Sequence, residues 1–304
     1  MKLTIALAAA AALAATALLT GCGAGPAEPP AAESVAPGAY AEVNGLRMYY
    51  EVHGTPTERP PLVLLHGALS GIGTDFGELI PELSKTRQVI AVEQQAHGHT
   101  ADIDRPLRTP QMAEDTVALL RGIGVQRADF LGYSMGAGVA LEITLRHPDM
   151  VRKQILAAGG LGAESMHPGL MEGVTKVKPE DLYGSPFHTD YLANAPRPQD
   201  FPRLVERVRE LNQNAILSYD REQVRRITAP TLTVIGDSDI VRPEHAVEMF
   251  RLFGGGVMGD TPAGLPDSQL AILPGTSHVG LVHRPDLLLP IIPAFLDAPV
   301  KGAR

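Results

Sequence analysis

Residues 129–140 read DFLGYSMGAGVA and place a single serine, Ser134, between two glycines. The apolar residues before Ser134 are typical of a buried strand, and the residues after it favour a helix. A serine at a sharp strand-to-helix turn is held in strained backbone geometry, and only small residues such as Gly132 and Gly136 fit two positions to either side. The stretch therefore predicts an exposed, nucleophilic serine if a base, an acid and an oxyanion hole occur elsewhere.

Two downstream segments contain the groups that such a serine requires, because its hydroxyl is a weak nucleophile until an oriented base takes its proton. Residues 231–235, TLTVI, are predicted as a strand, and the following GDSDIVRP contains Asp239, which we expect to reach the cleft as the orienting acid. The nearby Asp237 is expected to stabilise the loop through backbone hydrogen bonds. His278, in PGTSHVG after the last predicted strand, is the candidate base.

Short apolar runs alternate with helical patterns along most of the chain. Such alternation predicts βαβ units and a mostly parallel sheet flanked by helices. An Asn-Gly pair at 44–45 also predicts an antiparallel hairpin at the start. Strands are predicted over residues 41–43, 46–52, 62–65, 88–92, 130–133, 154–158, 231–235 and 270–273, and helices over residues 109–121, 135–146 and 243–253. Since reacting groups gather beyond the carboxyl ends of parallel strands, the three candidate residues are expected to meet there.

Residues 161–226 interrupt this alternation. Turn residues are followed by a charged helical stretch at 201–219, so we predict a helical cap inserted into a core formed by residues 39–160 and 227–304. The arginines of the cap alternate with glutamates, which favours a solvated helix face. Apolar cap residues are expected either to roof a substrate pocket or to pack within the cap: Met166, Leu170, Met171, Leu182, Tyr183, Phe187, Tyr191 and Phe201.

A second irregular segment lies between the candidate acid and the candidate base. Residues 254–268, GGGVMGDTPAGLPDS, are rich in glycine and proline and contain no periodic apolar pattern. They predict a mobile loop near the mouth of the site.

The N-terminal residues differ from the core in composition. Lys2 precedes an uncharged run rich in Ala and Leu at 3–19, which is typical of a secretory signal, and Leu-Thr-Gly-Cys then ends at Cys22, the only cysteine. This tetrapeptide resembles the lipobox of bacterial lipoproteins. The resemblance implies a signal peptide at 1–21, lipidation of Cys22, and export across the cytoplasmic membrane to a lipid-anchored position in the cell envelope. An ordinary cleaved signal peptide and an uncleaved membrane anchor are the alternatives.

A flexible tether is predicted between the signal peptide and the core, because residues 22–38 are dominated by Pro, Ala and Gly.

The composition of the whole chain favours a globular protein and limits its partners. The 304-residue chain is 44% hydrophobic and 20% charged, which is enough for a large core. Its net charge of -8 gives no basic footprint, so no nucleic-acid partner is expected. His97 and His99 are expected to make local hydrogen bonds, and no metal site is expected because no cluster of carboxylates or thiols accompanies them at ligand spacing.

The order Ser134, Asp239, His278, together with the segments LLHGA and GYSMGAG, resembles that of α/β-hydrolases. The resemblance covers about residues 40–296. It implies the α/β-hydrolase fold, a twisted and mostly parallel sheet with helices and an inserted cap, and it implies no cofactor. The activity it implies is hydrolysis of a small carboxylic ester or lactone through an acyl-enzyme on the serine.

The same resemblance assigns the oxyanion hole and leaves the substrate open. The backbone N–H groups of Ala68 and Met135 are the implied donors, with His66 shaping the loop that contains Ala68. Residues 91–100, AVEQQAHGHT, depart from the Asp-x-Arg-Gly-x-Gly form usual in relatives. The alternatives are a cofactor-free perhydrolase or haloperoxidase, another acyl hydrolase on the same triad, or a non-catalytic surface lipoprotein that binds a small ligand.

Overall fold

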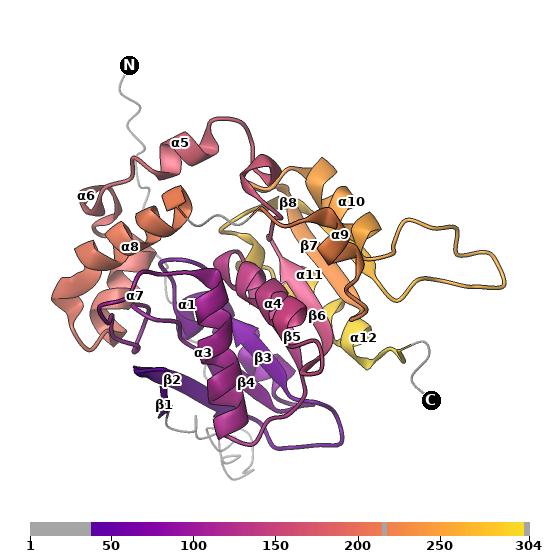
Figure 1. The fold of residues 1–304 in the computed structure, drawn as a ribbon, viewed down its shortest axis with the longest axis horizontal. Helices are drawn as coiled ribbons and strands as arrows, with labels where there is room; N and C mark the ends of the chain where they lie inside the picture. Colours follow the sequence, from indigo (N-terminus) through magenta and orange to yellow (C-terminus); the bar gives the residue numbers. More distant parts are fainter. Residues whose placement is uncertain (1–37, 215–217, 301–304) are drawn as a thin grey trace, which may run out of the picture. The chain divides into compact units, whose positions relative to one another are not determined.

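An eight-stranded sheet forms the centre of the computed structural model, which describes residues 38–214 and 218–300 (Figure 1). The strands are β1 Ala39–Val43, β2 Leu46–His53, β3 Leu62–Leu65, β4 Val89–Val92, β5 Ala128–Tyr133, β6 Val151–Ala157, β7 Thr231–Ser238 and β8 Gln269–Ser277. Their order is β1-β2-β4-β3-β5-β6-β7-β8. The predicted hairpin, β1 and β2, is antiparallel and joins β4 antiparallel, whereas all later neighbours are parallel. The signal peptide, the lipobox and all but the last residue of the predicted tether lie outside the described residues.

Helices cover both faces of the sheet. The α-helices are α1 Ile72–Phe76, α2 Ile80–Leu83, α3 Thr109–Gly122, α4 Met135–Arg146, α5 Leu170–Val174, α6 Pro179–Leu182, α7 Pro186–Asn194, α8 Phe201–Asn214, α9 Arg221–Arg225, α10 Pro243–Leu252, α11 Pro285–Leu288 and α12 Ile292–Asp297. Three short 3₁₀ helices are η1 Ala163–Ser165, η2 Pro198–Asp200 and η3 Leu281–His283. No helix in the described part of the chain is sufficiently long and apolar to cross a membrane.

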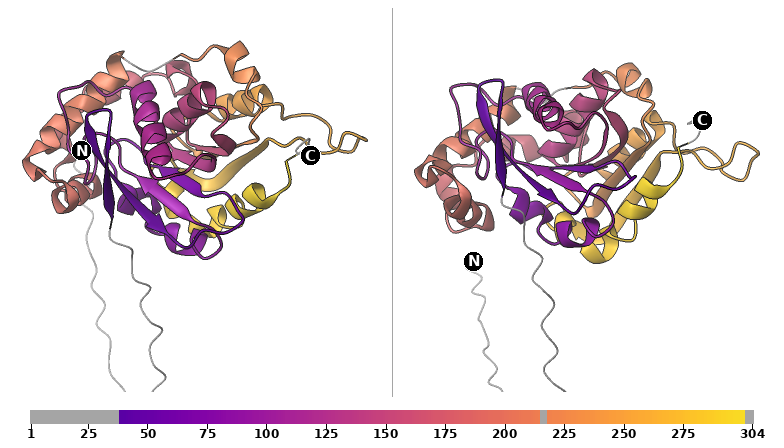
Figure 2. Two further views of the ribbon diagram at one scale, coloured as in Figure 1. Left: turned by 60° about the horizontal axis from the view of Figure 1, so that its bottom comes forward. Right: turned by 90° about the horizontal axis from the view of Figure 1, so that it is seen from below.

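The side chains of each central strand divide between two hydrophobic clusters. In β3, Val63 and Leu65 belong to the cluster that also contains residues of α3, α4 and α10, whereas Leu62 and Leu64 belong to the cluster that contains residues of α1, α2, α11 and α12. Because successive side chains in a strand point to opposite faces, a four-residue run that is wholly apolar must be covered on both sides. Figure 2 shows the two helical layers on either side of the sheet.

The segment between β6 and β7 holds short helices and, in its described residues, no strand of the sheet. Helix α8 packs its apolar face into the main core, with Phe201, Leu204, Val205, Val208 and Leu211 buried at helical spacing. The predicted solvated arginine face is wrong at Arg207, which is 6% exposed, because its guanidinium bonds to Asp102 and to the carbonyl oxygen of Ile103 rather than to water. Helix α9, inside the interval predicted as cap, contacts α10 of the core through Arg221 and Glu248.

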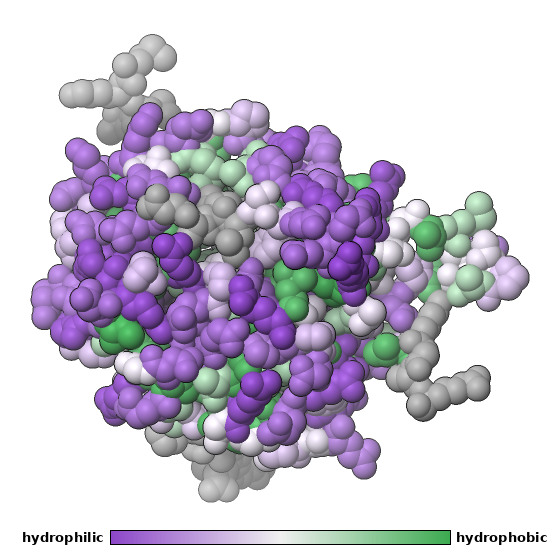
Figure 3. Space-filling model, viewed as in Figure 1, coloured by the Kyte–Doolittle hydropathy of each residue, from purple (hydrophilic) through white to green (hydrophobic). Residues whose placement is uncertain are grey.

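The structure also corrects the two C-terminal strands and the loop between them. Strand β7 continues past Ile235 to Ser238, and β8 begins at Gln269, which pairs with Leu232 near the start of β7. Because β7 and β8 are parallel, residues 254–268 lie at the amino ends of the strands, so their predicted position near the mouth of the site is wrong. This loop projects at the right of Figures 1 and 3 and exposes Val257, Met258 and Leu265.

Candidate active site

Ser134 lies at the turn between β5 and α4, in the middle of the sheet, with φ 53° and ψ −113°. The crowding around this turn explains the flanking glycines. A Cβ on Gly132 would lie 2.1 Å from the carbonyl oxygen of Gly136, and a Cβ on Gly136 would lie 2.0 Å from the carbonyl oxygen of Leu65. The sequence therefore admits no side chain at either position, and the turn holds the serine hydroxyl at the carboxyl edge of the sheet.

The structure brings the three predicted residues together. His278, directly after β8, places Nε2 3.0 Å from Ser134 Oγ. Its Nδ1 lies 2.7 Å from Oδ1 of Asp239, whose side chain is fully buried. Asp239 also accepts the backbone N–H groups of Val241 at 3.1 Å and Gly236 at 3.3 Å. The chain of contacts has the geometry in which a carboxylate orients an imidazole and the imidazole takes a proton from a hydroxyl.

Asp237 has a different role from Asp239, in the way that the sequence indicates. Its carboxylate is exposed and accepts the N–H groups of Gly275 at 2.8 Å and Thr276 at 3.1 Å. These backbone hydrogen bonds hold the pKa of Asp237 below its ordinary value. Asp237 thus ties the end of β7 to the end of β8, immediately before His278.

The loop after β3 carries Ala68, which lines the same cavity as Ser134 and Met135. His66 organises this loop. Its Nε2 accepts the N–H of Gln94 at 3.0 Å, so its Nδ1 carries the proton and donates to the carbonyl oxygen of Gly67 at 2.7 Å. Burial lowers the pKa of His66 to about 4, which keeps the ring neutral near pH 7. His66 therefore shapes the loop rather than serving as a second base.

Two residues near the site have no counterpart in the sequence analysis. Tyr133, which precedes the serine, donates its hydroxyl to the carbonyl oxygen of His278 at 3.0 Å, and burial raises its pKa. Asp75, in α1, is 4% exposed and accepts hydrogen bonds from the loop after β3. The Gly-x-Ser-x-Gly motif does not specify the residue type before the serine, and a single aspartate in a short helix gives no periodic signal. The sequence therefore predicts no role for either residue.

The side chains of the unusual segment at 91–100 form hydrogen bonds to the backbone of the same segment. Glu93 accepts the backbone N–H of His99 and lies 3.0 Å from the Nδ1 of that ring, which raises the pKa of His99. His97 is buried, with Nδ1 2.8 Å from the carbonyl oxygen of Gln95, and burial lowers its pKa to about 4. Among the described residues, no group of three or more His, Cys, Asp or Glu is arranged to hold a metal ion.

Ser134 opens into a mostly apolar cavity of about 210 Å³. Three of the apolar cap residues named from the sequence line it, Met166, Leu170 and Met171, together with Val174, Leu211 and Ile240. The other five have different surroundings: Tyr191 and Phe201 are buried in the core cluster, Leu182 packs against that cluster, Tyr183 is exposed and Phe187 is half-buried. The cap therefore supplies one wall of the cavity and uses its remaining apolar residues for packing.

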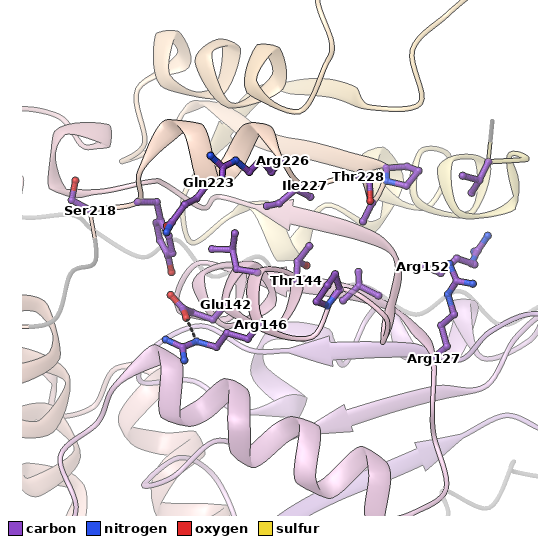
Figure 4. A pocket seen from close by; sticks show the side chains of 17 residues that line it. Arg127, Glu142, Thr144, Arg146, Arg152, Ser218, Gln223, Arg226, Ile227 and Thr228 are labelled. Atoms are coloured by element: carbon purple, nitrogen blue, oxygen red, sulfur yellow. Dashed lines mark hydrogen bonds and ion pairs between the residues drawn. The ribbon is translucent and has the colours of Figure 1, made fainter. Parts of the chain in front are cut away.

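A larger cavity of about 730 Å³ lies away from the serine, between α4 and the segment that precedes β7 (Figure 4). Its lining mixes apolar residues with four arginines, Arg127, Arg146, Arg152 and Arg226, and Glu142 forms an ion pair with Arg146 at 2.7 Å. Tyr219 lines both cavities. Because only the smaller cavity contains Ser134, we assign chemistry to that one.

Known proteins of similar sequence and structure are hydrolases. Residues 60–199 match the family model described as alpha/beta hydrolase fold. The chain is similar to the uncharacterized hydrolase YugF of Bacillus subtilis, with 25% identity over 87% of this chain and 99% of that protein. It is also similar to a putative esterase/lipase of Haemophilus influenzae, with 23% identity over 78% of this chain and 83% of that protein.

A solved structure gives the same result for the fold. MGS-M2, an alpha/beta hydrolase enzyme from a Medee basin deep-sea metagenome library, matches with a TM-score of 0.68 and 17% identity over 86% of this chain and 98% of that chain. The predicted α/β-hydrolase fold, with a mostly parallel sheet and a helical insertion, is thereby confirmed.

Proposed function

We propose that this chain, a hydrolase of the α/β-hydrolase superfamily, cleaves carboxylic esters or lactones through an acyl-enzyme on Ser134. The observation that carries the proposal is the continuous contact from Ser134 through His278 to Asp239, at 3.0 and 2.7 Å. The similarity to a protein named as a putative esterase/lipase also supports it. A small carboxylic ester or lactone needs no cofactor in this mechanism.

The proposed reaction proceeds through an acyl-enzyme in two halves. His278 Nε2 accepts the proton of Ser134 as Oγ attacks the carbonyl carbon, and the new C–O bond forms while the carbonyl electron pair moves to oxygen. The N–H groups of Ala68 and Met135 stabilise that oxyanion. The imidazolium then protonates the leaving alcohol as the ester bond breaks. Water, deprotonated by His278, attacks the acyl-enzyme and releases the acid.

The first test asks whether Ser134 is the nucleophile. A fluorophosphonate probe should label the wild-type protein, and Ser134→Ala should abolish both labelling and hydrolysis of nitrophenyl esters and lactones. Ser84→Ala is the matched control, because Ser84 is a serine at the end of α2 outside the cavity. Wild-type protein that takes up no probe would instead favour a non-catalytic ligand-binding protein.

The substrate assays also separate the alternative chemistry on the same residues. A perhydrolase would oxidise halide in the presence of peroxide and a carboxylic acid, and chlorination of monochlorodimedone reports that reaction. We expect ester or lactone hydrolysis to exceed it. Halide oxidation with no measurable ester or lactone turnover would replace the proposed function.

A further inference from the structure

Asp75 is a buried carboxyl group that the proposed mechanism leaves without a role. It lies in α1, immediately behind the loop that carries Ala68. Its Oδ2 accepts the backbone N–H of Gly67 at 2.7 Å and lies 2.6 Å from Ser70 Oγ. Burial raises the pKa of Asp75 to about 6, so keeping a carboxyl group here is costly. Both hydrogen bonds that the Asp75 carboxylate accepts come from this loop, so the role of Asp75 is to be sought there.

The contacts of Asp75 converge on one peptide group. Ser70 Oγ also lies 3.0 Å from the carbonyl oxygen of Gly67, which accepts the Nδ1–H of His66 at 2.7 Å. That carbonyl belongs to the same planar peptide as the N–H of Ala68. In a trans peptide the C=O and the N–H point in opposite directions. Holding the Gly67 carbonyl against the His66 N–H therefore sets the direction of the Ala68 N–H, while Asp75 accepts the N–H of Gly67 and fixes the Ser70 hydroxyl beside that carbonyl.

The backbone beyond this peptide is strained. Leu69 has φ 68°, a left-handed conformation that a leucine rarely adopts. Such strain persists only where surrounding contacts overdetermine the conformation. Space at this turn is also tight, since a Cβ on Gly67 would lie 2.9 Å from the ring of Tyr133 and 3.4 Å from Oδ2 of Asp75. The turn is thus confined by the Tyr133 ring and by the hydrogen bonds to Asp75.

We propose that Asp75 is a positioning residue for the oxyanion hole, which acts through Ser70 and Gly67 to direct the Ala68 N–H at the substrate carbonyl oxygen. This inference rests on the proposed function, because it assumes an oxyanion formed on a substrate that acylates Ser134. Asp75 touches neither substrate nor the reacting atoms. Its effect should therefore be confined to the step in which negative charge develops on oxygen.

The test compares two substitutions at the same position. Asp75→Ala removes the acceptor for Gly67 and Ser70, so we expect kcat for a nitrophenyl ester to fall on the order of 10²-fold while KM changes less than about threefold. Asp75→Asn should recover most of kcat, because an amide oxygen can accept the same two hydrogen bonds. Glu78→Gln is the control, since Glu78 is an exposed carboxylate three residues away that pairs with His283.

The affinity for a trifluoromethyl ketone inhibitor distinguishes a role in the oxyanion hole from a purely structural role, because a structural role would leave this affinity unchanged. The ketone forms a tetrahedral adduct with an oxyanion, so its affinity should fall in parallel with kcat in Asp75→Ala and recover in Asp75→Asn. Circular dichroism verifies that each variant is folded. If Asp75→Ala does not fold, Ser70→Ala takes its place, with kcat and ketone affinity expected to fall together on the order of tenfold.

Two results would overturn the inference. One is a folded Asp75→Ala, or Ser70→Ala in its place, that keeps wild-type kcat and ketone affinity. The other is a rise in KM with kcat unchanged, which would indicate a role in substrate binding. Fluorophosphonate labelling of the wild type separates this failure from failure of the proposed function, because labelling of the unaltered protein tests the activated serine without any change at Asp75.

Discussion

At the residue scale, two aspartates separated by one residue have opposite environments. Asp239 is buried against His278, whereas Asp237 is exposed and holds two backbone N–H groups of the strand β8. The difference arises because β7 continues to Ser238, so the chain turns into the cleft only after Asp237. Only Asp239 can stabilise the imidazolium that forms when His278 takes a proton.

We expect Asp239→Asn to lower kcat on the order of 10⁴-fold, because the amide leaves the imidazole in the wrong tautomer. Asp237→Asn is the matched control. It should lower kcat less than about tenfold, since the amide oxygen still accepts a backbone N–H. Steady-state kinetics on one nitrophenyl ester compares the two variants. The reverse ranking would show that Asp237 is the orienting acid.

At the scale of elements, a buried arginine of the cap, Arg207, bonds to the core. Arg207 of α8 donates from Nε to Asp102 Oδ2 at 3.1 Å and from Nη2 to the carbonyl oxygen of Ile103 at 3.2 Å. Asp102 also accepts the side-chain amide of Gln95 at 2.7 Å, within the unusual segment that follows β4. The segment at 91–100 and helix α8 are therefore coupled through shared acceptors, the Asp102 carboxylate and the Ile103 carbonyl oxygen, and α8 in turn contributes Leu211 to the cavity of Ser134.

Arg207→Ala should lower the free energy of unfolding by about 1–3 kcal/mol, because it removes two charge-assisted hydrogen bonds from a buried guanidinium to the half-buried Asp102 and Ile103. It should also raise KM, since α8 supplies part of the cavity wall. Arg209→Ala, two residues along the same helix and half-buried, should change stability by less than about 0.5 kcal/mol. Urea unfolding and ester kinetics measure both effects. Equal losses in the two variants would contradict the anchoring role of Arg207.

At the scale of the whole molecule, the sheet order gathers residues that are far apart in the chain. Ser134 follows β5, Asp239 follows β7 and His278 follows β8, and only β6 lies between β5 and β7 in the sheet. Ser134 and His278 are 144 residues apart in sequence yet in hydrogen-bond contact. The loop with Ala68 follows β3, which neighbours β5 on the other side. Parallel strands place all these segments at one edge.

The attachment of the molecule to a membrane remains a prediction from the lipobox. If Cys22 is lipidated, the protein should sediment with the membrane fraction and take up an alkyne-labelled fatty acid in cells, because several acyl chains give stable anchoring. Cys22→Ala should abolish the label and move the protein out of that fraction. Ser34→Ala, in the same tether, should leave both unchanged. Labelling that persists in Cys22→Ala would contradict the lipoprotein interpretation.

The positions of most strands, the glycine-flanked serine and the order of the candidate acid and base could be predicted from the amino-acid sequence, because local apolar patterns and turn residues encode these features. Residues 62–65 and 135–146, for example, form a strand and a helix over the predicted bounds. The three-dimensional fold was needed to learn which cap residues line the cavity, where the loop at 254–268 lies, and that Asp75 accepts a hydrogen bond from the turn with Ala68. These features depend on strand register and on contacts between distant segments, and neither leaves a periodic signal in one chain.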